Sequence, residues 1–185
     1  MTQHNHIKTI SEARGLQVGQ TVKDFSVTDI HGNIYILRKA LEKGPVVLIF
    51  IRGQWCPFCN KHLKQIQDKL PLIYAKGASV VVITPEKSEF IRQTIEKTGA
   101  EFTILYDEGD SIAAMFDVSF KPNAIERFMY NTIMRAKLKE SHSDDSEQLP
   151  VPATYIINQD FTIKWRHFNP DYKVRAKAED IINNL

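Results

Sequence analysis

Residues 50–63 read FIRGQWCPFCNKHL, and the rest of the chain is arranged around this stretch. The apolar run 46–51 leads into it and is rich in β-branched side chains, which is typical of a strand buried on both faces. From Asn60 onward apolar residues recur at spacings of three and four, which indicates a helix with one buried face. Pro57 suits the first turn of that helix, because its missing N–H would be unpaired there anyway. The sequence therefore places Cys56 between a central strand and a helix N-terminus.

The two cysteines of this stretch are the only ones in the chain, and their spacing predicts redox chemistry. First-turn amides and the helix dipole favour a thiolate, so we expect a lowered pKa at Cys56 and assign it as the nucleophile. Cys59 lies one turn further along the same face, where it could close a small disulfide ring as the resolving thiol. Arg52 and Lys61 would add positive charge, and Trp55 would either shield the pair or present an apolar docking surface.

A Cys-x-x-Cys pair can also bind zinc or form a structural disulfide. Zinc needs four ligands, and only His62 lies at a plausible local spacing, so we expect neither a metal nor another cofactor. The N-terminus, MTQHNHIKTISEARG, lacks the basic region and apolar stretch of a secretory signal. We therefore expect a cytoplasmic protein, in which this motif more often serves redox work than structure.

Composition narrows the class of protein further. The chain has 185 residues, of which 43% are hydrophobic and 25% charged, as in ordinary soluble globular proteins. Its net charge of +2 comes from interspersed residues, which argues against nucleic-acid partners, and the run 46–51 is too short to span a membrane. We expect an N-terminal arm at 1–15 and a single domain at 16–185.

The remaining pattern alternates between strands and helices. We predict strands at 25–28, 34–37, 79–84, 102–106, 154–157 and 162–168, and helices at 87–98, 111–116 and 174–185. A strand–helix–strand order implies a right-handed parallel crossover, so the fold class is α/β, with a β-hairpin near each end of the chain.

Residues 121–148 interrupt this alternation. They predict an inserted helix at 124–138, followed by an exposed charged loop, KESHSDDSEQ. Phe128, Met129, Ile133 and Met134 are expected to pack on the body, and the alternative is a subunit contact in a homodimer. Glu86 is interpreted as a solvated loop carboxylate and is left out of the site.

Several motifs together resemble one family. They are VGQTVKDF, HGNIYIL, RGQWCPFCNKHL, VVVITPE, TILYDEGDSIAAMF, LPVPATYIIN and DYKVR. With them the chain resembles, from Leu16 to its end, the peroxiredoxin-like AhpC/TSA group of the thioredoxin-fold superfamily. The resemblance implies a thioredoxin-like fold with a central mixed sheet flanked by helices, and an active cysteine at a helix N-terminus.

The motifs depart from the family's usual pattern at two places. Peroxiredoxins of the usual type carry Pro-x-x-x-Thr-x-x-Cys, whereas this chain has Ile49 and Gly53 at the matching positions. Pro152 stands where the family's activating arginine is expected, and it resembles the cis proline of thioredoxins. A cis proline would leave the backbone of Val151 free to pair with a partner's extended chain, and the alternative is an ordinary trans proline opening an edge strand.

Two enzymatic functions follow from this pattern. As an antioxidant thiol peroxidase, the protein would reduce a hydroperoxide through Cys56, condense it with Cys59 and be recycled by a thioredoxin-like or other thiol reductant. As a thiol-disulfide oxidoreductase, it would attack protein disulfides with the same pair. The flanking motifs favour the peroxidase, and the Cys-x-x-Cys with Pro152 favours disulfide exchange. A non-enzymatic redox sensor would form the disulfide without turnover.

Overall fold

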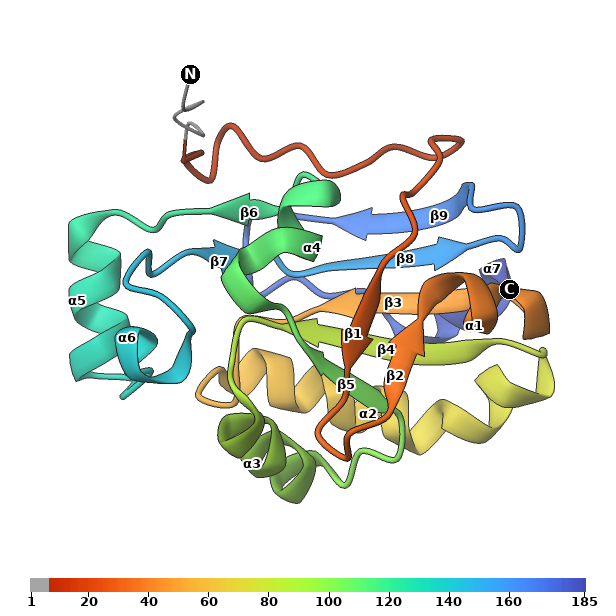
Figure 1. Cartoon of the computed structure of the whole chain (residues 1–185), viewed down its shortest axis with the longest axis horizontal. Coiled ribbons are helices and arrows are strands. Elements are labelled where there is room, and N and C mark those ends of the chain that lie inside the picture. Colours follow the sequence, from red (N-terminus) through yellow and green to blue (C-terminus); the bar gives the residue numbers. More distant parts are fainter. Residues whose placement is uncertain (1–6) are drawn as a thin grey trace.

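The computed structural model describes residues 7–185, and a five-stranded mixed sheet forms its centre (Figure 1). The strand order is β5-β4-β3-β8-β9. The three strands β3, β4 and β5 run parallel, while β8 is antiparallel to β3 and β9 is antiparallel to β8. The strand bounds are Val46–Phe50 for β3, Ser79–Thr84 for β4, Thr103–Tyr106 for β5, Ala153–Ile157 for β8 and Ile163–Phe168 for β9.

Helices cover both faces of this sheet (Figure 1). One face carries α2 (Pro57–Ala75), α3 (Ser88–Thr98) and α7 (Ala178–Asn184). The other carries α1 (Leu37–Lys43), the 3-10 turn η1 (Glu108–Asp110), α4 (Ser111–Met115) and the hairpin of β1 (Ser26–Thr28) with β2 (Ile34–Ile36). This arrangement confirms the predicted thioredoxin-like class and its N-terminal hairpin.

A smaller unit lies at the end of the sheet to which β3 and β4 run (Figure 1). It consists of α5 (Ala124–Thr132), α6 (Leu138–Ser141) and the short antiparallel pair β6 (Ser119–Phe120) and β7 (Leu149–Pro150). The backbone N–H of Lys87, just after β4, donates to the carbonyl of Ser141 at 2.8 Å. The inserted segment is thereby attached beside the carboxyl ends of the central strands.

The inserted helix is shorter than predicted. It ends at Thr132, because Arg135 and Lys137 take positive φ angles of 54° and 50° that no α-helix accommodates. The prediction that its apolar residues all pack inward is wrong for Phe128 and Ile133, which are 68% and 75% exposed. The following charged segment is not fully exposed either, since His142 within it is buried.

Both ends of the chain also differ from expectation. The predicted helix at 174–185 begins only at Ala178, and the residues before it form a turn and an extended segment. Helix α1 follows β2 directly, where the sequence indicated only a strand. Of the expected N-terminal arm, residues 1–6 lie outside the described range; the rest contacts the body through a hydrogen bond from Gly15 N–H to Asp117 O at 2.9 Å.

Strand β3 is the centre of the core, and every one of its side chains is buried, as its apolar run predicted. We expect Leu48→Ala on β3 to lower the free energy of unfolding by about 2–5 kcal/mol, because it removes buried methyl groups and leaves a cavity. The matched control is Leu72→Ala on α2, whose side chain is 52% exposed. Urea denaturation of both variants measures the difference, and equal losses would contradict this placement of the core.

Candidate active site

The cysteine pair lies at the junction between β3 and α2. Cys56 is the N-cap of α2 and Pro57 is its first residue, as the sequence predicted. The Cys56 sulfur accepts a hydrogen bond from the backbone N–H of Cys59 at 3.4 Å. The two cysteines form no disulfide, and both are fully buried. The helix N-terminus therefore presents a donor to Cys56, as the capping geometry requires.

Arg52 brings the first positive charge to the pair. It follows β3, is 1% exposed, and its Nη2 atom lies 3.4 Å from Cys56 Sγ. Its guanidinium is surrounded by aromatic rings, at 4.8 Å from the Trp55 centroid, 5.0 Å from Tyr130 and 3.8 Å from Tyr172. No carboxylate within residues 7–185 forms an ion pair with it. The sulfur pair is therefore the anion that this buried cation faces.

Arg175 brings a second positive charge that the sequence interpretation missed. Its Nη2 lies 3.2 Å from Cys59 Sγ and 3.8 Å from Cys56 Sγ. The residue belongs to the segment between β9 and α7, which was predicted to be helical. In the sequence, Arg175 belongs to the late motif DYKVR, which indicated the family but gave no role for the arginine. Lys61, the other basic candidate, is exposed on α2.

These charges act on two sulfurs that share one proton. Burial opposes ionisation, but the hydrogen bond from the Cys56 thiol and the charges of Arg175 and Arg52 lower the pKa of Cys59 well below its ordinary value. Burial and the negative charge on Cys59 raise the pKa of Cys56. The two arginines thus favour one thiolate within the hydrogen-bonded pair, with the pKa lowered at Cys59, and the assignment of Cys56 as the nucleophile stays a prediction. When the shared proton moves along the hydrogen bond from Cys56 to Cys59, the negative charge moves to Cys56.

Glu86 is the second residue that sequence reasoning misjudged. It is fully buried rather than solvated, because it follows the end of β4 and lies beneath the loop that precedes Cys56. Its Oε2 atom accepts the backbone N–H of Gln54 at 2.7 Å. Burial raises its pKa to about 8, and the charge on Cys59 adds to that shift. No pattern around Glu86 in the sequence indicated its burial.

Trp55 closes the site from one side. It is 8% exposed and its ring packs against Tyr130 of α5, with 5.3 Å between the centroids. Of the two roles expected for Trp55, this placement supports the shield and contradicts the exposed docking surface. The inserted helix thus contributes to the site through the ring of Tyr130.

The predicted peptide-docking backbone is not present. All peptide bonds within residues 7–185 are trans, including that of Pro152, so the cis expectation is wrong. Val151 is fully buried, and its N–H already donates to Val118 O at 2.8 Å. The physical reason is that β7 pairs with β6 just before this point and carries the chain extended into β8. The Val151 N–H is therefore not available to a partner's strand.

A cavity of about 220 Å³ adjoins Arg52. Its walls are mostly apolar or aromatic, and Arg52, Glu126 and Asp171 supply charge. The lining residues are Ile10, Arg52, Phe120, Glu126, Tyr130, Pro152, Pro170, Asp171 and Tyr172. Arg52 connects this space to the sulfurs, since its side chain lines the cavity while its Nη2 contacts Cys56.

Comparison with known sequences gives consistent matches. The sequence model of the AhpC/TSA family matches residues 18–166. The thiol-disulfide oxidoreductase ResA of Bacillus thuringiensis (strain Al Hakam) is 24% identical over 110 residues, which cover 59% of this chain and 62% of ResA. The chloroplastic peroxiredoxin Q of Sedum lineare is 32% identical over 94 residues, which cover 51% of this chain and 50% of that protein. The chain thus spans less than two thirds of these relatives' own length.

Solved structures share the fold. The crystal structure of peroxidoxin BcpB from Mycobacterium tuberculosis superposes with a TM-score of 0.72 at 21% identity, covering 91% of this chain and 96% of that one. A thiol:disulfide interchange protein DsbE from Chlorobium tepidum gives 0.58 at 19% identity, covering 91% and 98%. Both kinds of structure have the same arrangement of sheet and helices as this chain.

Proposed function

The chain belongs to the AhpC/TSA family, and on that basis we propose that it is a thiol peroxidase that reduces hydroperoxides through Cys56, with Cys59 as resolving thiol. The observation that carries this proposal is the pair of guanidinium groups on the buried sulfurs. Arg52 contacts Cys56 at 3.4 Å, and Arg175 contacts Cys59 at 3.2 Å. Buried cations aimed at a reacting sulfur stabilise both the thiolate and the charge that develops on peroxide oxygen.

The proposed chemistry has three steps. The Cys56 thiolate attacks one oxygen of ROOH, the O–O bond breaks, and the leaving oxygen takes a proton to give ROH and Cys56 sulfenic acid. The Cys59 thiolate then attacks Cys56 Sγ, an S–S bond forms, and the hydroxyl group leaves as water after taking a proton. An external dithiol supplies two electrons and two protons to restore the pair. The positive charges of Arg52 and Arg175 stabilise negative charge at the sulfurs in each of these steps.

Burial of the pair also favours a small substrate. Neither sulfur is exposed, and the peptide-binding backbone expected at Val151 is already occupied internally. A hydroperoxide can enter the cavity beside Arg52 without a macromolecule having to reach the sulfurs. A protein disulfide requires its own sulfur to come within bonding distance of Cys56, which the closed site does not allow without rearrangement.

The second candidate is disulfide exchange with protein partners. The observation that favours it is the free Cys-x-x-Cys at a helix N-terminus, together with the similarity to ResA. In that function Cys56 would attack a partner disulfide, and Cys59 would release the mixed disulfide. The Trp55 and Tyr172 side chains beside Arg52 would have to move to expose the sulfurs.

A direct comparison of the two substrates tests the proposal. The reduced protein is supplied with dithiothreitol and either cumene hydroperoxide or insulin, and hydroperoxide loss and insulin reduction are followed in parallel. We expect catalytic turnover of the hydroperoxide and insulin reduction at no more than the rate of dithiothreitol alone. Turnover of insulin with uncatalysed loss of hydroperoxide would replace the peroxidase by the second candidate.

A further inference from the structure

Glu86 is a buried carboxylic acid beside the cysteine pair for which the peroxidase steps give no role. It is two residues beyond β4 and is fully buried. Its Oε2 accepts the N–H of Gln54, while Oε1 has no hydrogen-bond partner within residues 7–185. A buried carboxyl oxygen left unpaired costs free energy, and that cost is smaller when the group is protonated and neutral.

The same carboxyl supports the loop that connects Arg52 to Cys56. A Cβ atom placed on Gly53 would lie 2.5 Å from Glu86 Oε1 and 2.6 Å from Trp55 Nε1. Only a residue without a side chain fits there, so the close approach of Glu86 depends on Gly53. The carboxyl thus lies against Gly53 and accepts the N–H of Gln54, within the loop that joins Arg52 to Cys56 in the sequence.

Charged groups from two helices act on Glu86. Cys59 on α2 raises its pKa, and Lys97 on α3 lowers it. Lys97 lies close because its Nζ donates to the carbonyl of Gln54 at 3.1 Å and also to that residue's side chain. Burial is the largest cause of the raised pKa of Glu86, Cys59 adds to it, and the resulting pKa is about 8 while the pair carries a thiolate. A disulfide carries no charge, so its formation removes the contribution of Cys59 and lowers the pKa of Glu86, while burial, the Gln54 hydrogen bond and Lys97 continue to act.

We propose that Glu86 is a redox-linked proton store that takes up a proton when the Cys56–Cys59 disulfide is reduced and releases it on oxidation. The inference rests on the proposed function only in requiring that the pair cycles between thiols and disulfide. A dithiol reductant gives two electrons and two protons. One proton becomes the thiol of the reduced pair, the second converts the Glu86 carboxylate to the acid, and the remaining sulfur stays a thiolate.

The proton balance gives the sign of the pH dependence. With Glu86 present, reduction by a neutral dithiol neither takes up nor releases protons between the Glu86 pKa of the oxidised protein and about pH 8, because Glu86 takes the second proton in that range. Without it, that proton enters the solvent, so reduction becomes more favourable as the pH rises. Between about pH 7 and pH 8, we expect the equilibrium constant for reducing the disulfide to rise more steeply with pH in the Glu86→Gln variant than in the wild type. The difference is expected to reach up to about tenfold per pH unit.

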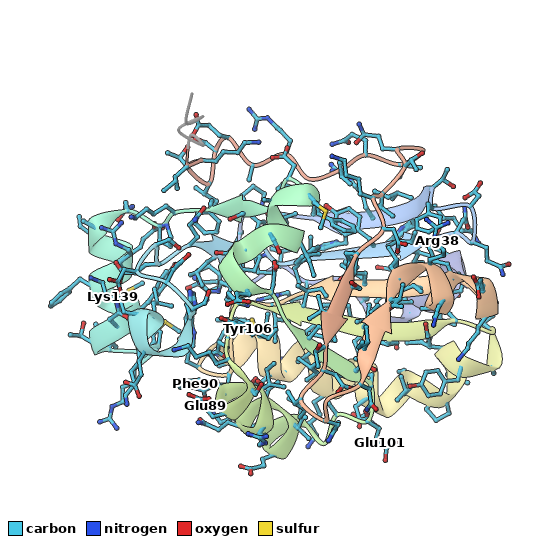
Figure 2. All side chains as sticks on the ribbon, in the orientation of Figure 1. Arg38, Glu89, Phe90, Glu101, Tyr106 and Lys139 are labelled. Carbon is cyan, nitrogen blue, oxygen red and sulfur yellow. The ribbon has the colours of Figure 1, made fainter. Side chains whose placement is uncertain are left out.

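The experiment equilibrates the full chain with mixtures of reduced and oxidised dithiothreitol at several pH values, traps the thiols by alkylation and counts them by mass. Glutamine keeps an oxygen acceptor for the Gln54 N–H, so the loop is retained. The matched control is Glu89→Gln, which removes an exposed carboxylate on α3 (Figure 2) and is expected to behave as the wild type.

A second measurement needs no variant. The infrared difference spectrum of reduced minus oxidised wild type is expected to show the carbonyl band of one protonated carboxylic acid. Asp110 is also buried with a pKa near 8, but its shift comes from burial and from Asp107 and Asp144, so it cancels in the difference. Parallel pH dependences in wild type and Glu86→Gln, or a spectrum without this band, would overturn the inference while leaving the peroxidase intact. A pair that forms no disulfide at any ratio would overturn both.

Discussion

Replacing Cys56 with serine is expected to abolish hydroperoxide turnover, with a loss of at least about a thousandfold. The reason is that the hydroxyl of serine cannot ionise beside Arg52 at neutral pH, whereas the sulfur pair carries a thiolate. The fold should be retained, because the two side chains differ by one atom and the position is an N-cap, where serine is favoured. Turnover with dithiothreitol and cumene hydroperoxide measures the loss.

Cys59→Ser is the matched variant for this prediction. It keeps Cys56 with its contact to Arg52 and removes only the resolving sulfur. We expect one equivalent of hydroperoxide to be consumed, a sulfenic acid to accumulate on Cys56, and no disulfide to form. The opposite pattern, with Cys56→Ser consuming peroxide and Cys59→Ser inert, would exchange the roles of the two cysteines.

The second large effect is expected at Arg175. Arg175→Met removes the guanidinium 3.2 Å from Cys59 Sγ and 3.8 Å from Cys56 Sγ while keeping an apolar side chain of similar length. Loss of one buried cation aimed at developing charge should lower the rate of oxidation about 10²–10³-fold at neutral pH. The control is Lys173→Met on the same segment, which is exposed and has no contact with either sulfur.

A pH profile separates this electrostatic role from simple packing. Arg175 lowers the pKa of Cys59, so its removal must raise the pH at which the pair first ionises. The rate of Arg175→Met should therefore recover in part as the pH rises, and Arg175→Lys should restore part of the rate at neutral pH. A rate that stays low at every pH, with lysine giving no rescue, would show that Arg175 only packs.

The parts of the fold that sequence could predict are those specified by local pattern. The buried run that became β3, the N-cap at Cys56 and the run that became β4 each depend on neighbours a few residues away. Gly99 likewise ends α3 in the left-handed conformation that glycine adopts readily. These predictions were sufficient to place the two cysteines at the end of a central strand.

The charged residues that act on the sulfurs could not be predicted, because their positions depend on contacts between residues far apart in the sequence. Arg175 lies 116 positions after Cys59 and reaches it only because the segment before α7 is not helical. The residues around Glu86 have the composition of an exposed loop. Glu86 is buried because the segment after β4 lies beneath residues 53–55. Local patterns give no information on which distant side chain closes over a buried sulfur.

The expectation at Pro152 failed for a related reason. A proline before a strand is compatible with either isomer, and the choice depends on what the preceding backbone contacts. Here Val151 N–H pairs with the carbonyl of Val118, a residue just before β6 that the sequence did not connect to it. Val118 therefore fixes the backbone beside the site, and the inserted region supplies its aromatic wall through Tyr130.

The most direct test of the central claim is the rate at which the reduced protein reacts with hydrogen peroxide. A substoichiometric pulse is mixed in a stopped-flow instrument with the Trp165→Phe variant, so that fluorescence reports on Trp55, which lies 4.8 Å from Arg52. The two cationic contacts predict oxidation at least about a thousandfold faster than that of a free cysteine, and its loss in Cys56→Ser. A rate equal to that of a free thiol would contradict the peroxidase and leave disulfide exchange as the function of the pair.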